Sequence, residues 1–522
     1  MTSATATGKM AVSCECVPEL TARLKELTRD CQKEELALVS MTPIQSLTIA
    51  FKEQRNRKEA TQPLFETFVN ILTAQLTEIE VFTDNPDSNR NRQLEACLRL
   101  IAECFRCLRN ACIQCVKNQS HGRNVGLFEP TIRILDLLHG LRFSQSDDLL
   151  AAIRCGLQFL GNFVTGNEES KHILWKSAFP DLFLHYLTQS DKKVVTYCCM
   201  VLFTCLNAER TADLLNHTKG VELAEAVIKI CKKEPELDWA FLIMTDQFLK
   251  CPDLMAELYI KLNNHERIVV LDLISVKLSE ILGCPAGSDD LSALMKMMQF
   301  LASCFLEKCM AVLKFTSATE EENEEAFIVI RLLDILCEAT SNYEKFSYLQ
   351  NSPGLLETVV DLLYQTHLAG KQQQNIFSIN QSLSFTDQTF HPAVGFKAHL
   401  IHLIGNLCYH NNENQDKRTK KGLTLQHLQF SPSLRIANLQ VRELGGIPII
   451  LDNCSIDDNN PFVSQWAIFT IRILTEQNLK NQEVISQMAY QGVADSAMLN
   501  NMGLQVEEQD GKLYVKSQGK SS

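Results

Sequence analysis

The sequence predicts an all-α protein, specifically an armadillo/HEAT-like right-handed α-solenoid. Three observations lead to this fold class. Segments with helical periodicity follow one another along most of the chain, and four of them share one apolar register. Glycine and proline are also scarce, at 21 and 14 of 522 residues, which excludes collagen-like, low-complexity and turn-rich all-β chains.

The expected helices have apolar residues at i, i+3, i+4 and i+7, and several follow a capping serine or aspartate. In chain order they span residues 19–39, 63–79, 92–115, 149–164, 194–206, 291–314, 325–339, 398–409 and 464–475. The one convincing strand signal comes near the end, where residues 505–508 and 512–516 flank Asp510-Gly511. This dipeptide suits a type I′ turn and predicts a small C-terminal β-hairpin.

The shared register appears when four of these helices are overlaid, with Asn110, Asn162, Asn406 and Ile473 at position zero. Position −5 then holds Phe105, Leu157, Ile401 and Ile468, position −2 holds Leu108, Leu160, Ile404 and Ile471, and position +8 holds Asn118, Ser170, Asn414 and Asn481. A proline opens a further helix at Pro130 and Pro180, about nineteen residues after position zero. Helical units of this kind bury one face against their neighbours, as in armadillo and HEAT arrays.

Charge and composition exclude several function classes. A net charge of −12 repels phosphate backbones, so we expect no nucleic-acid partner. No run approaches the roughly 18 apolar residues of a membrane span, and Lys9, Glu15 and Glu19 interrupt any leader-like start. We therefore expect a cytoplasmic protein without membrane insertion, whose 20 cysteines are reduced core residues. No catalytic or phosphate-binding motif occurs, which predicts a non-enzyme without a cofactor.

Two cysteine pairs, Cys104 with Cys107 and Cys112 with Cys115, have zinc-like spacing. Zinc ligands converge from turns, whereas residues 97–115 read as one helix, so cysteines on its buried stripe cannot all reach one ion. We expect core packing and no metal. His399 and His402, with Cys408 nearby, are likewise interpreted as an ordinary histidine pair on a helix.

The asparagines at position zero are the candidate groove residues: Asn110, Asn162 and Asn406. On the innermost helix of an armadillo unit, an amide can bond the backbone of an extended partner. The alternative, that these amides hold the adjoining loop, has equal weight. Importin-type grooves place tryptophan at position −4, where this chain has Arg106, Gln158 and His402. A groove for basic nuclear signals is therefore disfavoured.

Three aromatic residues, Phe462, Trp466 and Phe469, lie in the last unit of the array. A solenoid needs a polar cap or a partner over its open end, and aromatics are enriched at interface hot spots. These residues are the candidates for self-association and make the chain a predicted homo-oligomer. The alternative is that Trp466 packs under the terminal hairpin and caps the array internally.

Several runs resemble the ataxin-10 family of armadillo-like proteins: residues 51–57 (FKEQRNR), 103–110 (ECFRCLRN), 154–162 (RCGLQFLGN), 262–264 (LNN) and 446–454 (GIPIILDNC). The resemblance covers about residues 43–516. It implies a cytoplasmic and perinuclear protein, found also near the centrosome, cilium base and midbody. It further implies roles in neurite outgrowth, neuronal survival and cytokinesis, self-association through the C-terminal region, and partners that include a G-protein β subunit, O-linked N-acetylglucosamine transferase and ciliary or centrosomal proteins.

The expected segments, in order, are a variable N-terminal segment (1–42), N-terminal repeats (43–282), middle repeats (283–370), a polar loop (371–395), a self-associating C-terminal region (396–500) and a hairpin with tail (501–522). Residues 1–40, 371–395 and 418–440 depart from the family pattern. Pro448 lies at +42 after Asn406 where about +19 is expected, which predicts a loop insertion at 418–440, beginning in a basic run.

Together these observations predict a non-enzymatic scaffold or adaptor that binds proteins through an armadillo-type surface. The alternative is an importin-like cargo-binding transport adaptor.

Overall fold

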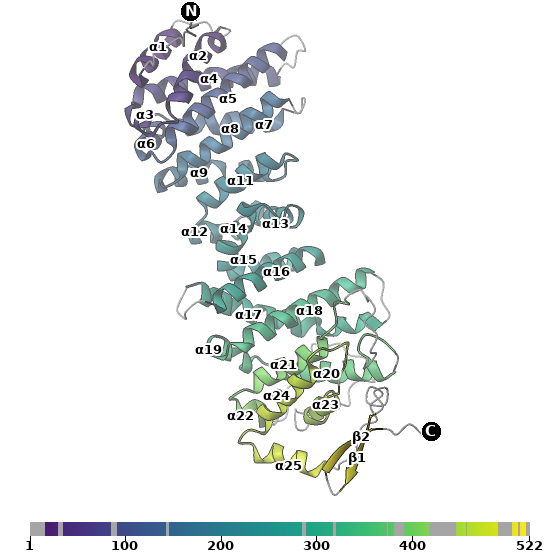
Figure 1. Ribbon diagram of the computed structural model, residues 1–522. Helices are drawn as coiled ribbons and strands as arrows, with labels where there is room; N and C mark the ends of the chain where they lie inside the picture. Colours follow the sequence, from purple (N-terminus) through teal and green to yellow (C-terminus); the bar gives the residue numbers. More distant parts are fainter. Residues whose placement is uncertain are drawn as a thin grey trace, which may run out of the picture. The chain divides into compact units, whose positions relative to one another are not determined.

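The computed structural model describes residues 16–29, 35–84, 91–141, 146–283, 289–316, 320–372, 374–379, 391–416, 445–455, 457–488, 504–509 and 512–517. The chain divides into two compact units, Met1–Leu254 (unit 1) and Met255–Ser522 (unit 2). Both are built from stacked helices, which confirms the predicted all-α solenoid class (Figure 1).

The helices of unit 1 are α1 (Val17–Arg29), α2 (Leu36–Ala50), α3 (Gln54–Glu59), α4 (Gln62–Asp84), α5 (Asn91–Cys112), α6 (Val116–Asn124), α7 (Phe128–Gly140), α8 (Asp147–Val164), α9 (Glu168–Ala178), α10 (Asp181–Leu187), α11 (Lys192–Cys205), α12 (Ala208–Asp213), α13 (Thr218–Lys233), α14 (Asp238–Asp246) and the 3-10 helix η2 (Phe248–Lys250). The last helix of each repeat packs against its counterpart in the next repeat, in the order α2, α5, α8, α11, α14. We call these the third helices.

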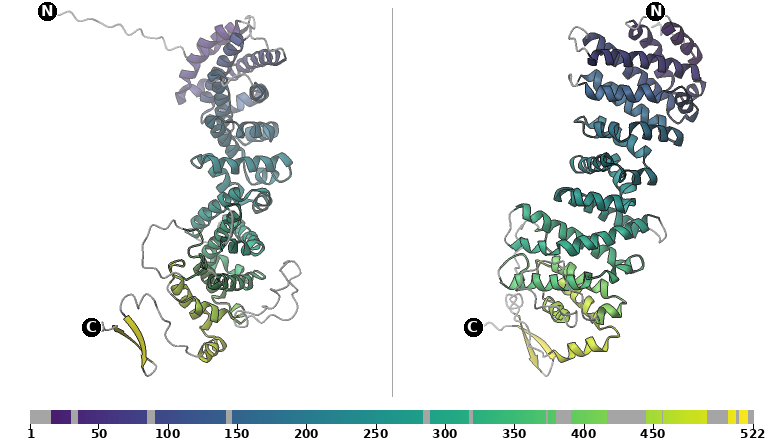
Figure 2. Two further views of the ribbon diagram at one scale, coloured as in Figure 1. Left: turned by 90° about the vertical axis from the view of Figure 1, so that its right-hand side faces the viewer. Right: turned by 180° about the vertical axis from the view of Figure 1, so that it is seen from behind.

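The helix α15 (Pro252–Lys261) contains the division between the units. Unit 2 continues with α16 (Asn264–Leu282), α17 (Asp289–Lys308), η3 (Cys309–Thr316), α18 (Glu320–Ser341), α19 (Tyr343–Phe346), η4 (Ser347–Asn351), α20 (Leu355–Gln372), α21 (Phe396–Cys408), α22 (Asn412–Asp416), α23 (Gly446–Asp452), α24 (Val463–Thr475), α25 (Leu479–Gln487), β1 (Leu504–Gln509) and β2 (Lys512–Ser517). Its third helices pack in the order α16, α18, α21, α24. Figure 2 shows the stacked helices of each unit from two further sides.

Three of the predicted helices have the wrong extent. The segment 19–39 contains two helices, α1 and α2, and the segment 291–314 ends its α-helix at Lys308 and continues as η3. The segment 92–115 ends at Cys112, because Gln114 takes a left-handed conformation with φ of 48° and Cys115 already begins the next helix as its N-cap. The remaining predicted helices have both ends within five residues of those of α4, α8, α11, α18, α21 and α24, the largest differences being at the end of α4 and the start of α18.

The predicted hairpin is present as two antiparallel strands, with Gln509 opposite Lys512 next to the turn. The turn residues lie outside the described residues, as does the expected insertion at 418–440. The expected polar loop at 371–395 is partly described: α20 extends to Gln372, and residues 374–379 and 391–395 contain neither helix nor strand. The segment boundaries expected from the sequence remain predictions.

The core follows the overlaid register. At position −5, Phe105, Leu157 and Ile401 are at most 2% exposed. The amides at position +8 close the turn after each third helix: Asn118 donates from Nδ2 to the carbonyls of Ala111 and Arg57, at 2.8 Å each, and Asn414 donates to those of Leu407 and Gln350, at 2.7 and 2.8 Å. Both side chains are buried and bridge two carbonyls each, so this polar exit is a structural element of the repeat.

Candidate functional site

The asparagines at position zero connect each third helix to the one before it. The Nδ2 atoms of Asn110, Asn162 and Asn406 donate to the carbonyl oxygens of Thr48 at 3.0 Å, Arg109 at 3.1 Å and Cys337 at 3.4 Å. Each acceptor lies in the last turn or two of the preceding third helix. The three amides therefore occupy equivalent places and hold neighbouring third helices together, and not only an adjoining loop.

These contacts bear on the predicted groove. Asn110 and Asn406 are buried, with 5% and 8% exposure, and Asn162 is half-buried. Asn406 Nδ2 also lies 3.1 Å from Thr340 Oγ1, and Asn110 Oδ1 accepts from Nε and Nη2 of Arg109, at 3.1 Å each. Because the amides already have partners, a bound peptide would meet the side chains around them first. The groove role of the three asparagines remains a prediction.

The same hydrogen bond identifies two position-zero residues that the overlay missed. The acceptor carbonyl belongs to position −1, so Thr48 and Cys337 place Ile49 and Glu338 at position zero. Neither is an asparagine, which is why comparing side chains alone did not find them. The sequence does contain a signal for Glu338. Asn342 follows four residues later and accepts a backbone N–H at the start of α19, as Asn411 and Asn478 do just after α21 and α24.

In unit 1, arginines surround the position-zero amides. Arg106 at position −4 pairs with Glu103 at −7, and Glu103 accepts from Thr48 Oγ1 at 2.6 Å. Arg109 donates from Nη1 to Gln158 Oε1 at 2.5 Å, so its side-chain hydrogen bonds to other described side chains go to amide oxygens. The side of α5 that carries Arg106 and Arg109 therefore presents two guanidinium groups held by hydrogen bonds.

In unit 2, the corresponding positions carry carboxylates, histidines and aromatics. We call the following set the unit 2 face: Asp272, Ser275 and Ser279 of α16, Arg331, Asp334 and Glu338 of α18, His399, His402 and Asn406 of α21, and Trp466 and Phe469 of α24. Asp334 Oδ1 lies 2.7 Å from His399 Nδ1, and the Trp466 ring stacks on His402 with centroids 3.5 Å apart. Burial lowers the pKa of His402 to about 4, with His399 adding to the effect, so this imidazole is neutral at neutral pH.

The last third helix, α24, differs from the others in exposure. Ile468 is 67% exposed, although its counterparts at position −5 in the internal repeats are buried. Phe462, Phe469 and Leu479 are also exposed, at 69%, 40% and 78%. Among the predicted self-association residues, the structure thus places Phe462 and Phe469 at the surface. It stacks the half-buried Trp466 on His402 and sets it edge-on to Phe469 at 5.8 Å.

Comparisons with known proteins show which family this chain is related to. A family model described as the spinocerebellar ataxia type 10 protein domain matches residues 434–516. Ataxin-10 of Xenopus tropicalis is 46% identical over 475 residues, which is 91% of this chain and 92% of the relative. Human ataxin-10 is 44% identical over 474 residues, with 91% and 93% covered. The chain belongs to the ataxin-10 family. The resemblance predicted from the sequence runs is therefore confirmed.

Among solved structures, a designed armadillo repeat protein is similar to this ataxin-10 family member at 14% identity and a TM-score of 0.32. The match covers 53% of this chain and 100% of the designed protein. The armadillo-like architecture is evident in the successive packing of the third helices themselves. Within the described residues, no helix is both long enough and apolar enough to cross a membrane.

The cysteine helix of this ataxin-10 family member is packed into the core. Cys104, Cys107 and Cys112 are fully buried, and burial raises the pKa of each thiol. Cys115 was expected on the same helix and stripe, but it lies beyond the end of α5 and is half-buried. No group of three or more metal-ligating side chains occurs within the described ranges. These thiols are arranged as packing residues, and absence of a bound metal remains a prediction.

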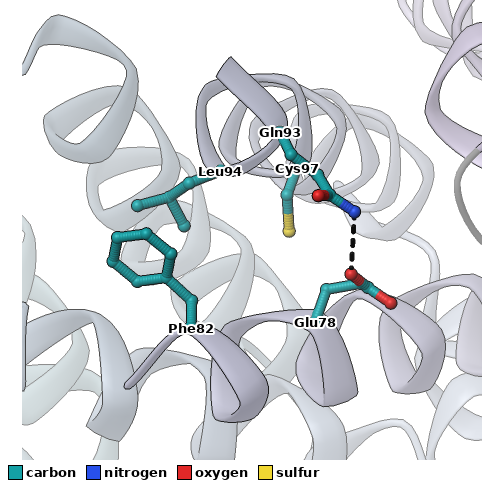
Figure 3. A pocket seen from close by; sticks show the side chains of 5 residues that line it. All are labelled: Glu78, Phe82, Gln93, Leu94 and Cys97. Carbon is teal, nitrogen blue, oxygen red and sulfur yellow. Dashed lines mark hydrogen bonds between the residues drawn. The ribbon is translucent and has the colours of Figure 1, made fainter. Parts of the chain in front are cut away.

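A small cavity lies beside this helix, between α4 and α5. Figure 3 shows the Cys97 thiol there with Phe82 and Leu94, while Gln93 Nε2 donates to Glu78 Oε2 at 3.1 Å across the opening. Its volume of about 20 Å³ suits about one water molecule. Burial raises the pKa of Cys97 to about 12, so its thiol is protonated at neutral pH. The cavity is too small to hold a cofactor.

Proposed function

We propose that this ataxin-10 family member is a non-enzymatic scaffold that binds partner proteins through its third-helix faces and self-associates through its last repeat, which contains α24. The observation that carries the self-association is the exposure of Ile468. An apolar side chain at position −5 is buried in three internal repeats and is 67% exposed in the last. Covering it with a second copy would continue the packing that internal repeats already use.

The proposed contact surface contains the predicted residues Phe462, Trp466 and Phe469, together with Ile468 and Leu479. Phe462, Ile468 and Leu479 are each more than two-thirds exposed, so they supply the apolar area. One face of the Trp466 ring stacks on His402. This contact fixes the orientation of the ring and leaves less of its surface for contact with a second copy. We therefore expect Ile468 to be the stronger anchor, and Trp466 the weaker one.

The proposed partner groove keeps Asn110, Asn162 and Asn406. In this proposal the amides fix the spacing between third helices, and the side chains at positions −4 and −7 contact the partner. The fold supports this role because a row of equivalent helices presents equivalent positions at regular intervals.

Sedimentation velocity of the full chain tests the self-association. We expect an oligomer at tens of micromolar, dissociated to a monomer by Ile468→Asp and weakened by Trp466→Ala. The matched control is Ile49→Asp, because Ile49 is 65% exposed on the third helix α2 of unit 1. A monomeric parent chain would refute the proposal. Equal dissociation by the control would show that the effect is not specific to the last repeat.

The cellular roles implied by the family resemblance belong to this proposal as well: neurite outgrowth, neuronal survival, cytokinesis and localisation near the centrosome and cilium base. So do a G-protein β subunit and O-linked N-acetylglucosamine transferase as partners. Proximity labelling with the full chain, beside a chain ending near residue 395, identifies which partners require the C-terminal region. Nuclear accumulation when nuclear export is blocked would favour the alternative cargo adaptor.

A further inference from the structure

We propose that the unit 2 face binds an extended, lysine- and arginine-rich segment of a partner protein. The inference rests on the proposed scaffold function and specifies the chemistry of one partner. Three carboxylates line this face, from Asp272, Asp334 and Glu338, against the single guanidinium of Arg331. A row of carboxylates on adjacent parallel ridges attracts a cationic chain laid across it.

The arrangement of these charges leaves one carboxylate with uncharged partners. Arg331 Nε lies 3.2 Å from Asp272 Oδ1, and its Nη1 lies 3.9 Å from Asp334 Oδ2. Glu338 accepts instead from the hydroxyls of Ser279 at 2.5 Å and Ser275 at 3.5 Å. These hydroxyls hold the carboxylate in place without neutralising it, so Glu338 keeps its negative charge for a ligand.

An aromatic platform adjoins the carboxylates. His402 Nε2 lies 3.3 Å from Ser341 Oγ at the end of α18, and the same imidazole stacks on Trp466 at an interplanar angle of 16°. Because His402 is neutral at neutral pH, it adds no positive charge that would repel a cationic side chain. Trp466 lies two third helices along from the carboxylates of α18, so one cationic side chain of an extended ligand can meet the carboxylates while another meets the tryptophan ring through a cation–π contact.

The geometry repeats along the face. Asp334 at position −4 contacts His399 at −7 of the next third helix, and His402 at −4 contacts Trp466 at −7 of the one after. Successive third helices therefore present their side chains in the same relation, which suits an extended chain that crosses the helices and places a residue at each. The tryptophan expected at −4 in a basic-signal groove is absent, but Trp466 supplies one at −7.

Fluorescence anisotropy of the full chain tests the proposal, with a labelled octapeptide of alternating lysine and serine as the probe. The variant is Asp334→Asn with Glu338→Gln, which removes two charges while preserving side-chain shape. The matched control is Asp181→Asn with Glu236→Gln, which removes two exposed carboxylates of unit 1 that pair with lysines. We expect the Kd for the peptide to rise at least tenfold in the unit 2 variant and to change less than twofold in the control.

Two further measurements separate the possible outcomes. Trp466→Leu should weaken binding about threefold or more, and an otherwise identical peptide with glutamate in place of lysine should not bind. Equal losses in the variant and its control would assign the binding to the overall charge of −12 and overturn the proposal. Sedimentation of the same samples separates failure of peptide binding from failure of self-association. Because Trp466 and Phe469 belong to both proposed surfaces, Ile468→Asp should dissociate the oligomer and keep or strengthen lysine-peptide binding.

Discussion

The two units join their third helices with the same hydrogen bond but surround it with opposite charges. Asn110 in unit 1 and Asn406 in unit 2 both donate to a carbonyl at position −1 of the preceding third helix. Around them, unit 1 places Arg106 and Arg109, whereas unit 2 places Asp334 and Glu338. Position +8 thus maintains the repeat in both units. The charged groups that differ between the units stand at position −4 (Arg106 and Asp334), at −1 (Arg109) and, in α18, at position zero itself (Glu338).

The largest effect should come from the ion pairs made by a lysine at the start of a third helix. In unit 2, Lys397 Nζ lies 3.6 Å from Asp457 Oδ2, with side chains only 2% and 3% exposed. Lys397→Met would leave a buried carboxylate without its cation and should lower the free energy of unfolding of unit 2 by about 3–5 kcal/mol. In unit 1, the corresponding lysine at the start of α11 is Lys192, which pairs with Glu234 at the surface.

Hydrogen–deuterium exchange resolved by unit measures this difference. Lys192→Met serves as the control, and we expect it to leave exchange in unit 1 unchanged. Adding Asp457→Asn to Lys397→Met should restore part of the protection in unit 2, because no buried charge then remains and the side-chain oxygen at residue 457 can still accept from Asn460 Nδ2. Normal protection in the single Lys397→Met variant would show that the pair does not stabilise the unit.

The amides at position +8 should have equal effects in both units. Asn118→Ala and Asn414→Ala each remove a fully buried donor from two backbone carbonyls and should cost about 2–3 kcal/mol. Urea denaturation with the same exchange measurement checks this. A large loss in one unit and none in the other would contradict the view that this position has one structural role throughout.

Acid should distinguish the units through His402. Its pKa is about 4 in the folded chain and 6.5 in the unfolded chain, so only the unfolded chain gains a proton between these values. Stability is therefore complete above pH 6.5 and falls as the pH drops toward 4, by about 2 kcal/mol for a ring that keeps some contact with solvent. In unit 1 the −4 residues are Arg106 and Gln158, and neither is a histidine.

Melting temperatures of the parent chain and His402→Gln between pH 7 and pH 4 check this contribution. The variant should lose less stability on acidification than the parent. His139 in unit 1 also has a lowered pKa, caused by burial and then by His185, so His139→Gln is the matched comparison. Parallel pH profiles for parent and His402→Gln would remove His402 from the explanation.

The parts of the fold that the sequence predicted are those encoded by periodicity. The register of Phe105, Leu157 and Ile401 follows from spacing alone, because residues on one side of a helix must face the neighbouring helix. The end of α5 was missed because Gln114 adopts positive φ without being glycine. The pair of Lys397 and Asp457 joins residues far apart in sequence, and such partners are set by stacking that periodicity does not describe.

The candidate site was predicted in the same partial way. The asparagines were placed on the correct helices, but the acceptor of each amide depends on how far one third helix is displaced along the next. That displacement also brings Trp466 onto His402, which are 64 residues apart and share no local pattern. The exposure of Ile468 could have been inferred from the sequence. The overlay aligned it with three apolar residues of internal repeats, and Ile468 lies in the last repeat, where no further repeat follows to cover it.

The smallest effect should come from position zero itself. Ile49 and Ile473 occupy this position without an amide, so the repeat tolerates its loss. Asn162 makes one bond of 3.1 Å to Arg109 and is half-buried, so Asn162→Ile should cost about 1 kcal/mol or less. Thermal unfolding measures this beside Asn162→Asp, which leaves a carboxylate facing the Arg109 carbonyl and should cost more. If Asn162→Ile abolishes partner binding while its stability stays close to that of the parent, the amide itself contacts the partner, and the division between structural and binding positions must be redrawn.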